Sequence, residues 1–127
     1  MIPARHAAKA EHMERSLQKV SAADYEAVIE GCMLAGTHWF NIALHKLGIT
    51  QPADDALHAE FLTAGVRSKL NLVMPEILNA LDEIENFRSL FVRGDAAHGE
   101  AAGRRCLELL ESLRRAADEA EPYWTRL

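Results

Sequence analysis

Arg93 and His98 form the part of this sequence whose residue types and spacing are best suited to chemistry. A guanidinium carries a fixed positive charge and an imidazole exchanges protons near neutral pH, so the pair suits reactions at a phosphate. On one continuous helix, residues five apart lie about 140° apart around the axis and point in different directions. Gly94 can end a helix between them, because glycine often follows the last turn of a helix. We therefore predict a helix break at Gly94 that lets the two side chains converge.

The residues that follow Gly94 extend this prediction. Asp95 can cap a new helix, which would place Arg93 at the end of one helix and His98 in the first turn of the next. Free N–H groups in a first turn favour a bound anion and disfavour protonated histidine. We therefore take His98 as a candidate general base, Arg93 as a candidate phosphate ligand and Asp95 as a candidate to orient the imidazole. The alternative is helix capping and surface charge without any catalytic role.

Apolar residues that recur every three or four positions predict the helices that would hold this pair. The predicted helices cover residues 3–20, 21–47, about 56–66, 75–93 and a last segment that begins between 95 and 101. Residues 67–74 are either a turn or an uneven continuation of the third helix. No alternating strand pattern with turn dipeptides occurs. The predicted fold class is therefore all-α, an up-and-down antiparallel bundle of four to five helices in one domain, 1–127, with the helix in 1–20 at its periphery because its apolar face is narrow.

The segment 21–47 carries the widest apolar stripe and is predicted to be the central helix, with Ser21 as its N-cap and Gly48 as its stop. Within it, Trp39 and Phe40 are expected in the core or at a dimer contact rather than stacked on a base. The other predicted core positions are Leu57, Phe61, Leu62 and Val66 in the short helix and Cys106, Leu107, Leu110, Leu113, Ala117, Ala120 and Trp124 in the last one.

Composition limits the classes of function. The sequence is 49% hydrophobic and 26% charged with a net charge of −5, which indicates a globular protein and argues against coating nucleic acid by bulk charge. Cys32 and Cys106 lie in helical patterns without a CxxC pair, so we expect buried, reduced cysteines. The N-terminal segment is interrupted by charges at every turn, which is not the pattern of a secretory signal. The longest uncharged run, 31–44, is too short to span a bilayer. A cytoplasmic protein without membrane contact is expected.

Two other sets of residues allow more than one interpretation. His38 and His45 lie seven apart on one side of the predicted central helix and could be metal ligands, but no Glu-x-x-His pattern accompanies them. We interpret them as hydrogen-bonded histidines of the core or its rim, and expect no metal and no cofactor. Arg88 either points inward toward a cleft or pairs with Glu85 on the surface, and the i, i+3 pair is favoured.

The hexapeptide RGDAAH, from Arg93 to His98, resembles the motif of the HEPN superfamily, small helical bundles with an arginine, a spacer of four to six residues and a histidine late in the chain. The flanking segments SLFVRG and HGEAAGRRCLELLESL fit this resemblance, and GTHWFNIALHKLGI is similar to the second helix of the family. The resemblance covers most of the chain from Ser21 onward. One difference is Gly94, because catalytic members usually carry a polar residue directly after the arginine; here aspartate follows one position later, at Asp95.

The resemblance implies a toxin-type, metal-independent endoribonuclease that acts as a homodimer. Neutral His98 would take the proton of a ribose 2′-hydroxyl and Arg93 would stabilise charge on the phosphorane, leaving a 2′,3′-cyclic phosphate. A two-fold dimer would bring two Arg–His pairs into one cleft. The resemblance also implies RNA as substrate and, for many members, an antitoxin partner, often a nucleotidyltransferase. The alternative is a non-catalytic module that binds a nucleotide or such a partner.

Overall fold

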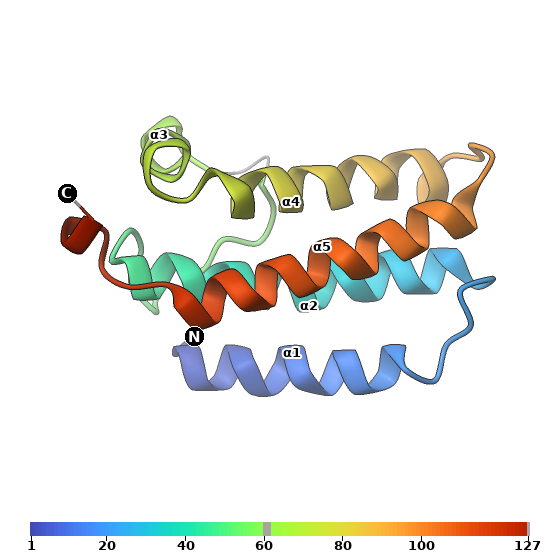
Figure 1. Cartoon of the computed structure of the whole chain (residues 1–127), viewed down its shortest axis with the longest axis horizontal. Helices are drawn as coiled ribbons and strands as arrows, with labels where there is room; N and C mark the ends of the chain where they lie inside the picture. The colour runs from blue at the N-terminus through green and yellow to red at the C-terminus, as the bar shows by residue number, and fades with distance from the viewer. Residues whose placement is uncertain (60–61, 127) are drawn as a thin grey trace.

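The computed structural model describes residues 1–59 and 62–126, and the regular secondary structure of these residues is helical (Figure 1). This confirms the predicted all-α class. None of the described helices is long and apolar enough to cross a membrane. In chain order the elements are α1 (Pro3–Leu17), α2 (Tyr25–Leu47), α3 (Ala64–Val73), α4 (Pro75–Phe87), the π-helix η2 (Arg88–Arg93), α5 (Gly99–Glu119) and the 3₁₀-helix η3 (Tyr123–Arg126).

The four long helices α1, α2, α4 and α5 run side by side, each antiparallel to the one before it, and the short α3 is seen end-on at one end of the bundle (Figure 1). α2 packs against α1, α4 and α5 and has its most extensive contact with α5. It is therefore the central helix, as its wide apolar stripe predicts. The connection between α2 and α3 and both chain ends lie at one end of the bundle, and the turn into α5 lies at the other (Figure 1).

The two ends of α2 show where local sequence signals succeed and fail. Gly48 has φ 79°, in the left-handed region, and the next backbone N–H, of Ile49, returns 3.0 Å to the carbonyl of Leu44, so the predicted stop is confirmed. The predicted N-cap, Ser21, is wrong. Its hydroxyl accepts a hydrogen bond from the backbone N–H of Ala23, which holds a turn, and the helix begins only at Tyr25.

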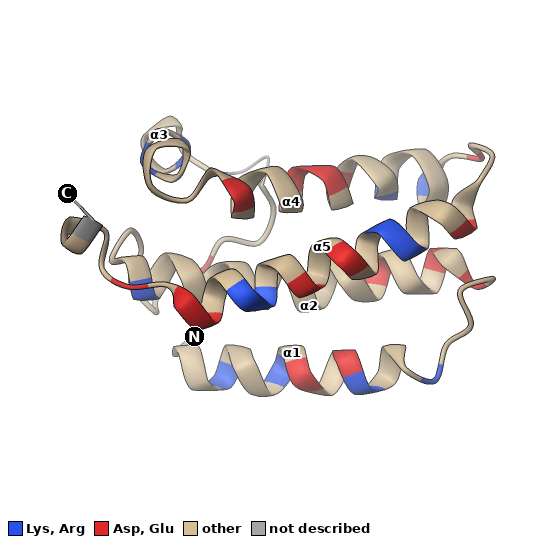
Figure 2. Ribbon diagram, in the orientation of Figure 1, with Lys and Arg blue, Asp and Glu red and all other residues tan. Residues whose placement is uncertain are grey.

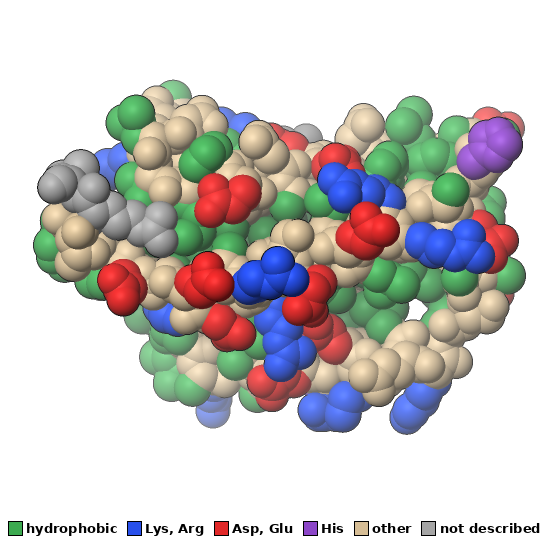
Figure 3. Space-filling view, in the orientation of Figure 1, with side chains coloured by type: hydrophobic (Ala, Val, Ile, Leu, Met, Phe, Trp, Pro, Cys, Tyr) green, Lys and Arg blue, Asp and Glu red, His purple; other side chains and the backbone are tan. Residues whose placement is uncertain are grey.

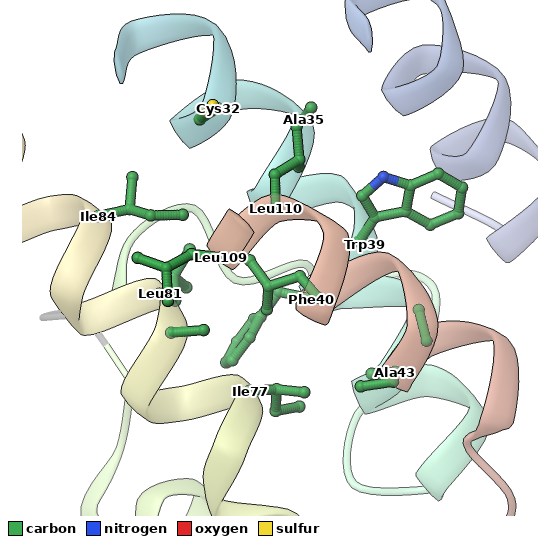
Figure 4. Packing of buried hydrophobic residues seen from close by; sticks show 14 of the residues in the cluster. Cys32, Ala35, Trp39, Phe40, Ala43, Ile77, Leu81, Ile84, Leu109 and Leu110 are labelled. Atoms are coloured by element: carbon green, nitrogen blue, oxygen red, sulfur yellow. The ribbon is translucent and has the colours of Figure 1, made fainter. Parts of the chain in front are cut away.

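The core lies between α2, α4 and α5, where Phe40 is fully buried and lies close to side chains of the other two helices (Figure 4). Cys32 and Cys106 are buried free thiols, as expected. Burial raises the pKa of both thiols, that of Cys106 to about 12, so neither is a nucleophile at neutral pH. The labelled core side chains in Figure 4 include Ile77, Leu81, Ile84, Leu109 and Leu110.

α1 begins at Pro3, at a position where the missing N–H is not needed, and it packs along α2 through a narrow face. The buried residues of that face are His6, Ala10 and Leu17. A Cβ on Gly31 of α2 would lie 2.5 Å from Leu17 Cδ2, so the helices approach closely because this residue has no side chain.

The helix predicted over about 56–66 is wrong for residues 56–58 and 62–63, and among the described residues only 64–66 belong to an α-helix, as the start of α3. Residues 51–58 form a turn, a bend and irregular backbone. α3 begins at Ala64 and is capped by the Thr63 hydroxyl, which accepts from the Val66 N–H at 3.2 Å. The reason is tertiary: the buried Asn41 side chain bonds both the N–H and the C=O of Ala56 at 2.7 Å, so these groups are unavailable to a helix. Leu57, a predicted core residue, is 70% exposed, and Phe61 lies outside the described residues. Residues 67–73 are helical, so of the two alternatives for 67–74, a turn or a continuation of the third helix, the helix is present.

α5 confirms most of the predicted core positions. Leu107 is an exception, 41% exposed, and Trp124 lies beyond α5, in η3, and is 59% exposed. Successive helical residues advance by about 100°, so Leu107 turns away from the face that Cys106 buries, and Leu109 is buried instead. The buried face consists of Gly99, Ala102, Gly103, Cys106, Leu109, Leu110, Leu113, Ala116 and Ala117.

Candidate functional site

The turn between η2 and α5 contains the helix break that the sequence predicts at Gly94. The Gly94 N–H bonds the Ser89 carbonyl at 3.0 Å, and the Ala96 N–H bonds the Leu90 carbonyl at 3.1 Å, so the chain leaves the helix through a wide turn. The backbone of Gly94 is extended, at φ −97° and ψ −170°, not left-handed as in a usual glycine stop. Glycine is needed for a different reason: a Cβ there would lie 2.7 Å from the Leu90 carbonyl oxygen.

Substitution of Gly94 tests this turn directly. We expect Gly94→Ala to lower the free energy of unfolding by about 1–3 kcal/mol, because the new methyl group has to displace the end of η2. The matched control is Gly65→Ala in the first turn of α3, where the nearest atom to a new Cβ is Thr63 Oγ1 at 3.9 Å. The control should be neutral or slightly stabilising in urea denaturation, since alanine favours helix. Equal stability of the two variants would contradict the close approach of position 94 to the Leu90 carbonyl oxygen.

His98, not Asp95, occupies the N-cap position of α5, so the predicted cap is wrong. Residues 95–97 are used to turn the chain, and α5 starts only where Gly99 packs on the ring of Tyr25, which a Cβ at Gly99 would meet at 2.5 Å. His98 therefore lies just before the first turn rather than within it, and its backbone has φ 70° and ψ 36°. A non-glycine residue in this left-handed region is uncommon, and such strain tends to occur at functional positions.

Arg93, Asp95 and His98 are all exposed at the end of the bundle where α5 begins. Figure 3 shows a histidine side chain on the surface at this end. Within the part of the chain that the structure describes, none of the three side chains forms a hydrogen bond or an ion pair, so the expected contact between Asp95 and His98 is absent there. Arg93 lines a hollow of about 190 Å³ with Arg67 and residues of α4, and His98 does not line it. A single chain thus brings the pair to one end of the bundle but not into one pocket.

Acidic side chains balance most of the arginines near this turn. Figure 2 shows both signs of charge along α1 and α5. Arg88 Nε lies 2.6 Å from Glu30 Oε1 on α2, and Arg88 Nη1 lies 3.9 Å from Glu85. The favoured pair with Glu85 is therefore present, but the shorter contact joins two helices. The hydrogen bond to the Glu30 carboxylate raises the pKa of Arg88 further, so in this structure the guanidinium is occupied by an ion pair between η2 and α2.

A second cluster of polar residues lies at the opposite end of the bundle. The sequence did not predict that these residues come together. His6 Nε2 and His45 Nε2 lie 2.9 and 2.8 Å from the same oxygen, Oδ1, of Asp55. His6 Nδ1 lies 2.8 Å from His38 Nδ1, and the Met1 ammonium lies 3.0 Å from Asp55 Oδ2. His38 and His45 are thus hydrogen-bonded histidines of the core and its rim, as expected.

The burial of this cluster affects its ionisation. Burial lowers the pKa of His6 and of His38, so both are neutral at neutral pH. Burial also opposes ionisation of Asp55, but hydrogen bonds from His6, His45 and the chain's ammonium group outweigh it and hold the Asp55 pKa at about 2. The cluster is therefore a carboxylate that accepts from two imidazoles.

Part of this cluster could have been found from periodicity. His6 precedes Ala10 and Leu17 by four and eleven positions, so it lies on the same, buried face of α1. No sequence pattern marked Asp55 as part of a buried cluster. It follows Asp54 in a predicted turn, where aspartates usually serve as caps or turn residues.

Comparison of the chain with protein-family models, with curated proteins and with solved structures finds no match.

Proposed function

We propose that this protein is a HEPN-like endoribonuclease that acts without a metal ion, as a homodimer in which the Arg93 and His98 of two protomers share one cleft. One observation carries the proposal. The helix breaks at Gly94, so Arg93 and His98 lie on either side of a short turn, both exposed and without ion-pair partners among the described residues. A continuous helix would have pointed them apart.

The geometry of a single protomer supports the proposal of a dimer. Cleavage of a phosphodiester by internal attack requires one group to accept a proton and another to donate one. This turn supplies one imidazole, and His98 does not share the hollow that Arg93 lines. A two-fold axis next to residues 93–98 would place two imidazoles and two guanidiniums around one phosphate.

The proposed reaction is transesterification within RNA. One neutral His98 takes the 2′-hydroxyl proton, the 2′-oxygen attacks phosphorus, and the bond from phosphorus to the 5′-oxygen breaks. The second His98, protonated, gives its proton to the leaving 5′-oxygen. Both Arg93 side chains stabilise the extra negative charge of the phosphorane. The products are a 2′,3′-cyclic phosphate and a 5′-hydroxyl end. Asp95 supports the reaction if it orients an imidazole once RNA is bound.

The test is the chemistry of the product ends. Incubation with structured RNA in the presence of a chelator should give 2′,3′-cyclic phosphate and 5′-hydroxyl ends. A 5′-phosphate end, or cleavage that needs a divalent ion, would contradict this mechanism.

A groove beside α1 favours a second candidate function, a non-catalytic HEPN-like module that binds a nucleotide or a nucleotidyltransferase antitoxin. The groove has a volume of about 580 Å³, within the usual range of ligand sites, and its lining includes the cations Arg5 and Lys9 with the apolar Met13 and Leu34. A nucleotide offers phosphates to the cations and a base to the apolar side chains. A nucleotide that binds to the unmodified protein, with no cleavage of RNA, would favour this function over catalysis.

A further inference from the structure

Three side chains from separate parts of the chain converge on one point: His6 of α1, His45 of α2 and Asp55 of the connection between α2 and α3. Their ligand atoms, the two Nε2 nitrogens and one carboxylate oxygen, all lie within 4.8 Å of one another. We propose that His6, His45 and Asp55 bind a zinc ion that joins these three segments.

The donor set selects the class of metal. Two imidazole nitrogens and one carboxylate oxygen are typical ligands of zinc and neighbouring transition metals, whereas magnesium and calcium prefer oxygen alone. Tetrahedral bonds of about 2.0–2.1 Å require ligand atoms about 3.3 Å apart. The nitrogen–oxygen separations of 2.9 and 2.8 Å therefore have to widen by about 0.5 Å to admit the ion. Water would complete the coordination.

The two histidines are held in the orientation that a metal needs. Both side chains are only 2% exposed. The far nitrogen of each ring has its own partner, His38 Nδ1 at 2.8 Å from His6 and Thr50 Oγ1 at 2.8 Å from His45. Metal-bound imidazoles usually donate their second N–H to an outer acceptor, which fixes the ring and its tautomer. The His38 ring nitrogen and the Thr50 hydroxyl oxygen can each act as that acceptor here. The outer contacts therefore already direct both Nε2 atoms at the proposed ion.

The same contacts are compatible with the metal-free and the zinc-bound forms. Without metal, each Nε2–H donates to Asp55, and each Nδ1 accepts from its outer partner. With zinc, each Nε2 lone pair binds the ion, each ring carries its proton on Nδ1, and the outer hydrogen bonds run in the reverse direction. No buried nitrogen loses its partner in either form.

The ion also has a route of entry. Asp55 is 24% exposed, and it lines a hollow of about 340 Å³ together with Thr50 and residues at the start of α3. The cluster lies near the N-terminal end of α1, and the turn 94–98 lies at the other end of the bundle (Figure 1). The proposed zinc site is therefore separate from the proposed nuclease site, and the zinc proposal does not depend on the nuclease proposal.

The test is a titration of chelator-treated full-length protein with Zn²⁺ by calorimetry at neutral pH, followed by Co²⁺ as a spectroscopic probe. We expect one Zn²⁺ per chain and a rise in Tm when the ion is bound. His45→Gln should weaken zinc binding about 100-fold or more, since loss of even an outer partner costs 10–100-fold, and Thr50→Val should weaken it about tenfold. Bound Co²⁺ should give the visible bands of a tetrahedral site.

The matched control is His12→Ala, which removes an exposed α1 histidine outside the cluster and should leave zinc binding unchanged. If His45→Gln does not fold by circular dichroism, Asp55→Asn replaces it, because an amide oxygen can accept the same two N–H bonds without the charge. That variant should bind zinc at least tenfold more weakly. Absence of zinc binding by the unmodified protein at micromolar concentrations, or equal binding by the folded cluster variants, would overturn the proposal.

Discussion

His98→Ala is expected to lower the rate of RNA cleavage by about 10²–10⁴-fold, the usual effect of removing a general acid–base group. Both proton transfers of the proposed reaction use this imidazole, one in each protomer, so the effect should lie toward the upper end of that range. The side chain is exposed and has no hydrogen bond within the described residues, so its removal should leave the fold intact. The rate is measured on structured RNA under single-turnover conditions with a chelator present.

Arg93→Ala belongs to the same experiment, with an expected loss of about 10²–10³-fold if the guanidinium stabilises charge in the transition state. His12→Ala removes an exposed histidine at a distance from the turn and should retain full activity. Sedimentation should show a dimer for every variant, because all three substituted side chains are exposed and none forms a hydrogen bond or an ion pair within the described residues. If His98→Ala cleaves as well as the unmodified protein, the catalytic hypothesis is wrong. The second candidate function, a non-catalytic binding module, is then favoured.

Phe40→Ala is expected to cost about 3–5 kcal/mol of stability, which is a large fraction of the 5–15 kcal/mol typical of a whole domain. The ring is fully buried and lies among side chains such as Ile77, Leu81 and Leu109 of the two neighbouring helices (Figure 4). Removing it leaves a cavity where α2, α4 and α5 meet, and packed helices cannot close such a space completely. Urea denaturation should show a lower midpoint with an unchanged m-value.

The matched control is Leu34→Ala on the same helix. Leu34 is 52% exposed, so the substitution creates no cavity and should change the free energy of unfolding by no more than about 0.5 kcal/mol. Similar losses for the two variants would mean that the face of α2 carrying Phe40 is not the main packing surface of the bundle.

Local signals were sufficient for most of the architecture. The spacing of apolar residues predicted the central helix, and the glycines at positions 48 and 94 marked two helix ends, because helix periodicity and the demands of a close turn act within a few residues. The position of Arg93 and His98 on either side of a break was predictable for the same reason. Their catalytic role stays a prediction.

Contacts between distant residues decided the rest. The segment around Ala56 carries a helical pattern, but Asn41, fifteen positions earlier, binds its backbone groups and keeps it out of a helix. Asp95 has the chemistry of a cap, but the packing of Gly99 on Tyr25 moves the start of α5 and makes His98 the N-cap. His6 and Asp55 are 49 positions apart and became a pair only because α1 and the α2–α3 connection fold onto the same end of α2. Such contacts depend on how helices pack in space, and no window of neighbouring residues contains that information.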